Sequence, residues 1–298
     1  MITEFLNSIS VKDPKAVTLF EKYEFLSQYH FNDFIKHEND PLTFSARFHS
    51  WLLNFKDEDE KIAFFRLFDY FFYVSRKEFN HLYRSSFSKN IKLWLLALSE
   101  INPISNDVNL KLDSLVADVW FTSCTDSFNL HEFCKVNDIS QKIIGIEWRG
   151  FFIHNRITLK EIDKNETIYD PVKKILVSNK VKMIVVLEDF VGTGTQSSNT
   201  IMKLCNIVTR LKESGCMIDL NILFVPIIIC PTGVKHLREL CIKFDFLKVS
   251  PVIVLPDISF LGAVQLESSY CRECSLVLSK YNDVVFYQSS LSVNVKKS

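Results

Sequence analysis

The segment from residue 185 to residue 196 reads Val185-Val186-Leu187-Glu188-Asp189-Phe190-Val191-Gly192-Thr193-Gly194-Thr195-Gln196. Apolar residues lead into an adjacent acid pair, and small, hydroxyl-rich residues follow. This pattern predicts a buried strand that ends in the acid pair and turns through a loop into a helix. In an open parallel sheet, ligands bind at the carboxyl ends of the strands. We therefore expect the acid pair to lie at a ligand-binding crevice.

The loop from Gly192 to Gln196 has the composition of a phosphate-binding loop. It offers backbone N–H groups at a helix N-terminus, where the helix dipole favours an anion. The glycines allow close approach of the backbone, and Thr193 and Thr195 add hydroxyl donors. A phosphate in this loop would place an attached sugar over Glu188 and Asp189, whose carboxylates accept hydrogen bonds from ribose hydroxyls. The segment therefore suits a ribose 5-phosphate.

Three alternatives to a ribose 5-phosphate site could explain this segment. A nucleotide-binding P-loop requires a lysine after its second glycine, and this loop has none. The dinucleotide fingerprint requires a third glycine where Ser197 stands. A purely structural strand-to-helix turn remains an alternative, although two adjacent acids at the end of an apolar strand are costly to bury without partners.

The segment resembles the phosphoribosyl pyrophosphate (PRPP) motif of type I phosphoribosyltransferases, in which four apolar residues, two acids and two apolar residues precede a Thr/Gly loop. The resemblance implies that Glu188 and Asp189 are catalytic residues that bind the ribose hydroxyls. It also implies a 5-phosphate site made of Gly192, Thr193, Gly194, Thr195 and Gln196. The sequence departs from the motif where Glu188 replaces the commoner aspartate, Thr195 a glycine and Gln196 a threonine.

The form of the motif is most similar to a divergent branch, the phosphoribosyltransferase-like domains of bacterial conflict and anti-phage systems, including some retron operons. The resemblance covers residues 111–298. It implies an α/β fold with a mostly parallel sheet and a hood-like insertion, preceded by an all-α N-terminal domain. It also implies PRPP or a related ribose 5-phosphate nucleotide as the ligand, with Mg²⁺ as the cofactor.

A second loop supports the same resemblance. The predicted strand Val119–Ser123 leads into Thr125-Asp126-Ser127, and in type I transferases the loop at this place holds the pyrophosphate. Capping of the following helix by Asp126 or Ser127 is an equally open reading. The resemblance implies basic pyrophosphate ligands, which could come from Arg149 or Arg156; solvated loop arginines are the alternative. His154 lies between them and could act as an acid or base near neutral pH.

Residues 111–298 alternate short apolar runs with helical patterns, which predicts a parallel sheet built from β-α repeats. Residues 139–165 do not fit the repeat and are expected to form the hood or insertion. The expected strands are Val119–Ser123, Lys182–Leu187, Leu220–Ile229, Leu247–Leu255 and Val284–Tyr287. The expected helices are Leu130–Val136, Ser198–Ser214 and one through His236–Lys243.

Residues 1–110 read as a helical domain rich in phenylalanine. The chain has 26 phenylalanines, 15 of them before residue 90, and no glycine before Gly145. Helix start signals occur at Asp40-Pro41, at the acidic run 57–60 and at Ser75, which has Glu78 three residues later. A base-stacking surface would need basic residues between the aromatic ones, so the aromatic stripes favour a helix–helix core.

The overall composition excludes several classes of protein. A hydrophobic fraction of 47% excludes an intrinsically disordered chain. The net charge of zero gives no indication of a nucleic acid partner. No apolar run is long enough to span a bilayer and no signal peptide is evident, so we expect a cytoplasmic protein without a membrane anchor. Cys271 and Cys274 have metal-like spacing but no second pair, so reduced thiols are expected and no metal site is assigned.

Three functions remain open at this point. The first is an effector enzyme in anti-phage defence that binds PRPP with Mg²⁺ and transfers the phosphoribosyl group. The second is a sensor or interaction module that binds PRPP or a nucleotide without turnover in a defence complex, because fold alone does not establish catalysis. The third is a scaffold that acts through the helical domain alone. In the second case the N-terminal helices would contact a protein partner.

Overall fold

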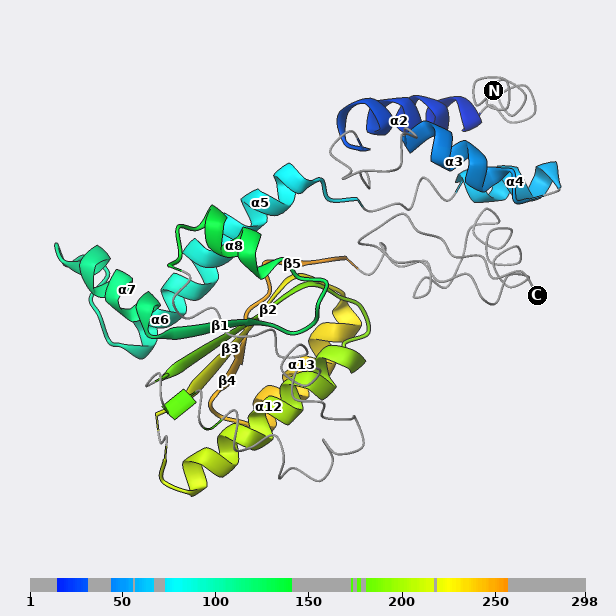
Figure 1. The fold of residues 1–298 in the computed structure, drawn as a ribbon. Coiled ribbons are helices and arrows are strands. Elements are labelled where there is room, and N and C mark those ends of the chain that lie inside the picture. The colour runs from blue at the N-terminus through cyan, green and yellow to red at the C-terminus, as the bar shows by residue number, and fades with distance from the viewer. Residues whose placement is uncertain are drawn as a thin grey trace. The chain divides into compact units, whose positions relative to one another are not determined.

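The computed structural model describes residues 15–31, 44–55, 57–66, 73–140, 173, 176–177, 181–216 and 219–256 (Figure 1). These residues fall into two compact units, of which the first contains the described residues up to Phe79 and the second is Asn80–Pro256. The predicted domains 1–110 and 111–298 extend beyond the described residues and stay predictions. Among the described residues, no helix has both the length and the hydrophobicity that a bilayer span requires.

The described part of the first unit is helical around an aromatic core. Its helices are α2 (Lys15–Tyr29), α3 (Phe44–Leu52) and α4 (Glu58–Arg66). The acidic first turn of α4 confirms the start predicted from the run 57–60. The side chains buried in this core are Leu19, Tyr23, Phe31, Phe48, Leu52, Phe55 and Phe65. The packing of these rings confirms the helix–helix core for the described stripes, and the all-α character of residues 1–110 as a whole stays a prediction.

A run of helices leads toward the sheet. It consists of α5 (Arg76–Ser85), the π-helix η3 (Ser86–Ile91), α6 (Lys92–Leu98) and α7 (Val108–Ala117). The capping box predicted at Ser75 is confirmed: Glu78 Oε2 accepts from the Ser75 N–H at 2.7 Å, and the Glu78 N–H donates to Ser75 Oγ at 3.2 Å. Two otherwise unpaired donors at the start of α5 are thus satisfied.

The second unit is built on a parallel sheet. Its strands are β1 (Val119–Ser123), β2 (Met183–Val191), β3 (Asn221–Ile229), β4 (Leu247–Val249) and β5 (Ile253–Val254). The order is β1-β2-β3-β4, and β5 pairs with the far end of β3. Helices α8 (Leu130–Val136), α12 (Thr195–Glu213) and α13 (Pro231–Lys243) follow β1, β2 and β3. The predicted α/β class with a parallel sheet is confirmed.

Side chains alternate between two faces of the sheet, as the strand period requires. Ile184 and Val186 pack in the cluster that α12 and α13 contribute to. On the other face, the Phe133 ring of α8 lies 6.2 Å from the ring of Phe121 in β1 and 5.6 Å from that of Tyr83 in α5. Figure 1 shows α12 and α13 on one side of the sheet and α5, α6 and α8 on the other. The sheet is therefore covered on both faces, as expected for parallel strands.

A proline inside the central strand β3 is compensated by a side chain from the π-helix. In the parallel register, Pro226 accepts from the Val252 N–H at 3.0 Å but has no N–H to donate to the carbonyl of Ser250. The Asn90 side-chain amide donates to this carbonyl at 3.1 Å and to Ser250 Oγ at 2.9 Å. Asn90 therefore closes the gap that Pro226 leaves in the ladder.

Three predicted element boundaries need correction. β2 does not end at the acid pair but continues to Val191, because β3 pairs with it as far as Ile229. α12 begins at Thr195, three residues before the predicted start at Ser198. The predicted strand Leu247–Leu255 is two short strands, since the bend at 250–252 interrupts it. The predicted strand Val284–Tyr287 and residues 141–165 of the predicted hood lie outside the described residues.

Candidate functional site

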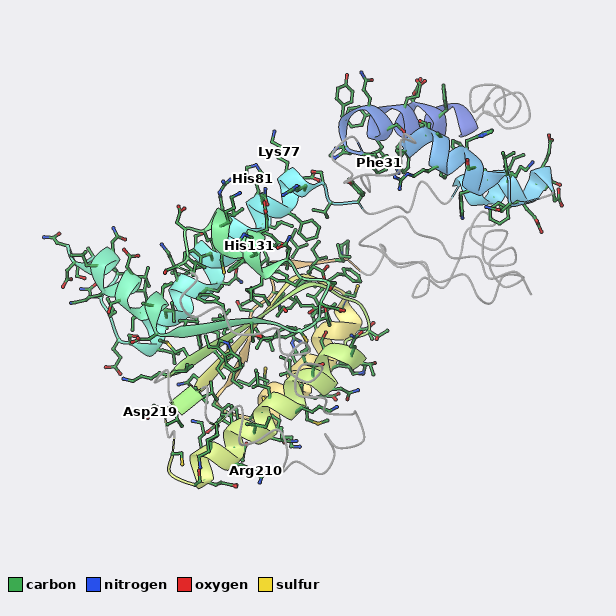
Figure 2. The ribbon with its side chains drawn as sticks, viewed as in Figure 1. Phe31, Lys77, His81, His131, Arg210 and Asp219 are labelled. Atoms are coloured by element: carbon green, nitrogen blue, oxygen red, sulfur yellow. The ribbon has the colours of Figure 1, made fainter. Side chains whose placement is uncertain are left out.

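The candidate site lies at the carboxyl edge of the sheet, beyond the end of β1. β1 pairs with β2 only as far as Ser123 opposite Leu187, whereas β2 continues for four more residues. The loop after β1 therefore runs beside the exposed edge of β2, at the position of the acid pair. Asp219, labelled in Figure 2, precedes β3 and marks the opposite edge of the sheet. The acid pair therefore lies near the carboxyl ends of the strands, and the ligand-binding crevice expected there stays a prediction.

Glu188 is buried at the carboxyl end of the sheet, with 4% of its surface exposed. Its Oε1 accepts from the Thr125 hydroxyl at 2.6 Å. Its Oε2 is buried and has no hydrogen-bond partner among the described residues. Burial raises the pKa of Glu188 to about 8, with a further rise from the charge of Asp189 and a partial offset from the Thr125 hydrogen bond. A proton on Glu188 near neutral pH removes the repulsion between the two adjacent acids.

Asp189 occupies the other face of β2 and is less buried. Its Oδ1 accepts from the Ser127 hydroxyl at 3.0 Å and from the Phe190 N–H at 2.8 Å. Burial raises its pKa, and these hydrogen bonds oppose the rise. Burial raises the pKa of Tyr83 in α5, and the negative charge of Asp189 raises it further. The backbone and a serine thus orient Asp189.

The loop after β1 connects the two acids. The hydroxyls of Thr125 and Ser127 lie 2.7 Å apart, and Ser127 also lies 3.5 Å from Glu188 Oε1. The reading of Asp126 or Ser127 as a helix cap is wrong. Asn129 caps α8 instead, because its side chain accepts from the Glu132 N–H at 2.9 Å. Asp126 and Ser127 are exposed at the site edge and remain candidate ligand contacts.

The proposed phosphate loop leads into a long helix. Gly194 has a left-handed backbone, with φ of 84°, and forms the N-cap of the 19-residue helix α12 without a side-chain cap. The first-turn N–H groups of a helix have no acceptor within the helix. In α12 the Thr195 N–H makes a long contact of 3.5 Å with the Thr193 hydroxyl, and the helix N-terminus favours an anion. Thr193, Thr195 and Gln196 are exposed beside these N–H groups. The hydroxyls of Thr193 and Thr195 lie 3.3 Å apart.

Two residues of α13 hold this loop, and the sequence reasoning missed both. A Cβ on Gly194 would lie 2.9 Å from Gly233 Cα, and a Cβ on Gly233 would lie 2.8 Å from the carbonyl oxygen of Gly192. His236 Nδ1 lies 2.6 Å from the carbonyl oxygen of Thr193, which assigns a proton to Nδ1. A glycine near a helix start, in a chain with only seven glycines, was the available sequence signal for Gly233.

Several residues singled out in the sequence lie outside the described residues. They are the predicted pyrophosphate ligands Arg149 and Arg156, the possible acid or base His154, and Cys271 and Cys274, for which no metal site was predicted. Within the described part of the chain, no cluster of three or more histidine, cysteine, aspartate or glutamate residues could hold a metal ion. The buried Cys124 thiol stays protonated, since burial and then the adjacent Glu188 carboxyl raise its pKa.

Taken together, the described residues bring two of the three predicted subsites into contact. Thr125 and Ser127 touch the acid pair, and the 192–196 loop continues directly from it. Chemically, the edge offers hydroxyl and carboxylate acceptors beside a helix N-terminus that favours an anion. This arrangement can bind a polyhydroxylated phosphate ester.

Comparison with known proteins gives one match. The sequence model of the PRTase-CE family matches residues 48–292. No curated protein and no solved structure gives a significant match. The matched range includes β1, β2 and every described residue of the candidate site.

Proposed function

This chain belongs to the PRTase-CE family, and from that premise we propose that its phosphoribosyltransferase-like domain binds PRPP, or a related ribose 5-phosphate nucleotide, at the carboxyl edge of the sheet. The observation that carries the proposal is the contact between the Thr125–Ser127 loop and the acid pair 188–189. It brings a candidate pyrophosphate loop and a candidate ribose site together, and the helix N-terminus at Gly194 follows within the same segment.

Each part of PRPP has a counterpart in this arrangement. The 5-phosphate would bind the N–H groups at the start of α12 with the hydroxyls of Thr193 and Thr195. The ribose would lie over the acid pair. The pyrophosphate would lie against Thr125, Asp126 and Ser127, and the basic partners that the family resemblance implies would come from Arg149 or Arg156.

Mg²⁺ is the cofactor that this ligand would bring. Mg²⁺ usually keeps several waters and is held by one or two carboxylates together with phosphate oxygens, not by a cage of protein ligands. The hydrogen bonds from Ser127 and Phe190 go to Oδ1 of Asp189, so Oδ2 can serve as such a carboxylate oxygen. When bound, the ion would neutralise charge on the pyrophosphate.

The reaction we propose is transfer of the phosphoribosyl group. The bond between C1 of the ribose and the pyrophosphate oxygen breaks, the oxygen keeps the electron pair, and an acceptor attacks C1. The chain would contribute orientation of the ribose and stabilisation of charge, which require no covalent bond to the protein. The acceptor could be a base, a nucleotide or water.

Calorimetric titration with PRPP and ribose 5-phosphate, each with Mg²⁺, tests the binding site. We expect Asp189→Asn to weaken binding of both ligands at least about ten-fold, because a charge-assisted hydrogen bond contributes about 1.5–3 kcal/mol. Asp219→Asn is the matched control: it removes an exposed carboxylate at the opposite edge of the sheet. The proposal is wrong if wild-type protein binds neither ligand, or if the two variants bind equally well.

A sensor without turnover is the second candidate function. It is supported by the departures from the transferase motif at Glu188, Thr195 and Gln196. Release of pyrophosphate from PRPP, followed with a range of nucleobase and nucleotide acceptors, separates the two. Turnover above the Asp189→Asn background supports the enzyme, and binding without turnover supports the sensor.

We also propose a role in anti-phage defence, with the N-terminal helices contacting a protein partner. The support is the resemblance of the motif to defence-associated domains and the exposed aromatic pair Phe25 and Tyr29 on α2, whose rings lie 5.0 Å apart. Phage plating on bacteria that express the chain with its neighbouring genes tests the role. Loss of protection in Asp189→Asn, and in the Phe25→Ala/Tyr29→Ala double variant, is expected.

A further inference from the structure

The two adjacent acids of the site differ sharply in their surroundings. Glu188 is 4% exposed and directs one oxygen to the Thr125 hydroxyl at 2.6 Å. Asp189 is partly exposed, and both the Ser127 hydroxyl and the Phe190 N–H bind a single one of its oxygens. If both acids bound the ribose equally, both carboxylates would need similar access to the ligand. The different burial and contacts of Glu188 and Asp189 show that their access is unequal.

Glu188 and Asp189 are held by neighbouring residues of the loop after β1. The Thr125 hydroxyl donates to Glu188 at 2.6 Å, and the Ser127 hydroxyl donates to Asp189 at 3.0 Å. The two hydroxyl oxygens lie 2.7 Å apart, so a displacement of Thr125 also affects Ser127. The contact between Glu188 and Thr125 therefore helps to set the position of the whole loop.

The other side of Glu188 is closed by the protein. Cys124, which is buried beside it, follows directly after β1, and the Cys124 N–H donates to the carbonyl of Leu187 at 2.8 Å. Glu188 Oε2 is buried, with no hydrogen-bond partner among the described residues. Glu188 is therefore less accessible to a ligand than Asp189.

We infer that Glu188 is a positioning residue that holds the Thr125–Ser127 loop against β2, and that Asp189 alone of the pair contacts the ligand. The inference rests on the proposed function for the identity of the ligand. It assigns ribose recognition to Asp189 and makes the pyrophosphate loop depend on Glu188. Glu188 thereby favours ligands that carry a diphosphate at C1 over those that do not.

Two substitutions at Glu188 separate positioning from direct contact. Glu188→Gln keeps an acceptor oxygen for Thr125 and removes the titratable group, whereas Glu188→Met keeps similar volume and removes the acceptor. We expect Glu188→Met to weaken PRPP binding at least about ten-fold and to leave ribose 5-phosphate binding within about two-fold. Glu188→Gln should restore PRPP binding to within about three-fold of wild type. Asp189→Asn should weaken both ligands equally.

Thr125→Val breaks the same contact from the loop and covers the case in which Glu188→Met does not fold. It should lower PRPP binding selectively, as Glu188→Met does. The double variant Glu188→Met/Thr125→Val should lose no more PRPP affinity than the more impaired single variant, because both substitutions remove the same interaction. The inference is overturned if Glu188→Gln weakens both ligands as much as Asp189→Asn, or if both Glu188→Met and Thr125→Val bind PRPP like wild type.

A measurement without ligand separates this inference from the proposed function. In hydrogen exchange of the protein alone, the amides of residues 125–127 should exchange at least about ten-fold faster in Glu188→Met and at the wild-type rate in Glu188→Gln. If wild-type protein binds neither ligand, the proposed function is wrong, and this exchange pattern still supports the positioning role. Unchanged exchange in Glu188→Met overturns the positioning role whatever the ligand.

Discussion

The close approach of Gly194 to Gly233 predicts how much an alanine substitution in the proposed phosphate loop lowers the stability of the protein. Gly194 has φ of 84°, and a Cβ there would lie 2.9 Å from the Cα of Gly233. Gly215 has φ of 71° and no atom within 4 Å of its Cβ position. Alanine at Gly215 therefore carries only the cost of a left-handed backbone. Alanine at Gly194 carries the same cost and a contact with backbone that must move.

The two costs can be estimated separately. An L-residue in the left-handed region costs about 1–2 kcal/mol, so we expect Gly215→Ala to lower the free energy of unfolding by that amount. Overpacking against a fixed neighbour adds about 1–3 kcal/mol, so Gly194→Ala should cost about 2–5 kcal/mol. The difference between the two variants is the energy of the contact with Gly233. A difference of about 2 kcal/mol corresponds to about 4–8 °C in Tm.

Thermal and urea unfolding of both variants measure this difference, and PRPP titration measures its effect on the loop. Because the contact displaces the start of α12, Gly194→Ala should also weaken ligand binding at least about ten-fold. Gly215→Ala, at the far end of α12, should bind like wild type. Equal destabilisation by the two substitutions would show that the loop and α13 do not approach each other as described, and would falsify this reasoning.

Three further predictions concern single contacts. Burial raises the pKa of Glu188 from 4.5 to about 8, so the folded state binds more protons than the unfolded chain in this range and stability falls as the pH rises through it. The full fall is about 5 kcal/mol, for a pKa rise from 4.5 to about 8 at about 1.4 kcal/mol per pKa unit, and Glu188→Gln should remove most of it. If the stabilities of wild type and Glu188→Gln in urea change in parallel from pH 4.5 to 8.5, the pKa assignment is wrong. Asn90→Ala should cost about 1–3 kcal/mol because the carbonyl of Ser250 loses its donor; an unfolding midpoint equal to wild type would exclude this role. Ser75→Ala should cost about 1 kcal/mol through loss of the capping box, seen as faster hydrogen exchange in the first turn of α5 only.

The sheet was the part of the fold that sequence reasoning reached best. β1 and α8 have the predicted bounds, because both are short apolar patterns with clear polar limits. β2 was predicted too short, since the acid pair ends the apolar run before the strand ends. The neighbouring strand β3 explains this difference. Its apolar run reaches Ile229, which pairs with Val191, so pairing with β3 extends β2 beyond the two acids.

The start of α12 and the interrupted strand show two other limits. The first residues of α12 are mostly threonine, serine and asparagine, which have weak helix propensity, and no apolar period begins before Ile201. Their helical state follows from Gly194, whose left-handed backbone turns the chain. The break in 247–255 was readable from Pro251, which cannot donate within a strand. The π-helix η3 had no sequence signal, because its register depends on the contact of Asn90 with the 250–251 bend.

The contacts of the proposed phosphate loop show how far a local motif determines the geometry of the candidate site. The motif 188–196 supplies the acids, the hydroxyls and the left-handed glycine, but two of its constraints come from α13, which follows the next strand. Gly233 sets how closely the carbonyl of Gly192 can approach, and His236 binds the carbonyl of Thr193. The loop therefore has its conformation only when β3 and α13 are packed beside β2. Because the same packing buries Glu188 opposite Pro226 of β3, the phosphate loop and the acid pair are set by one β-α-β-α unit. The motif alone identifies this site, whereas the unit as a whole gives it its geometry.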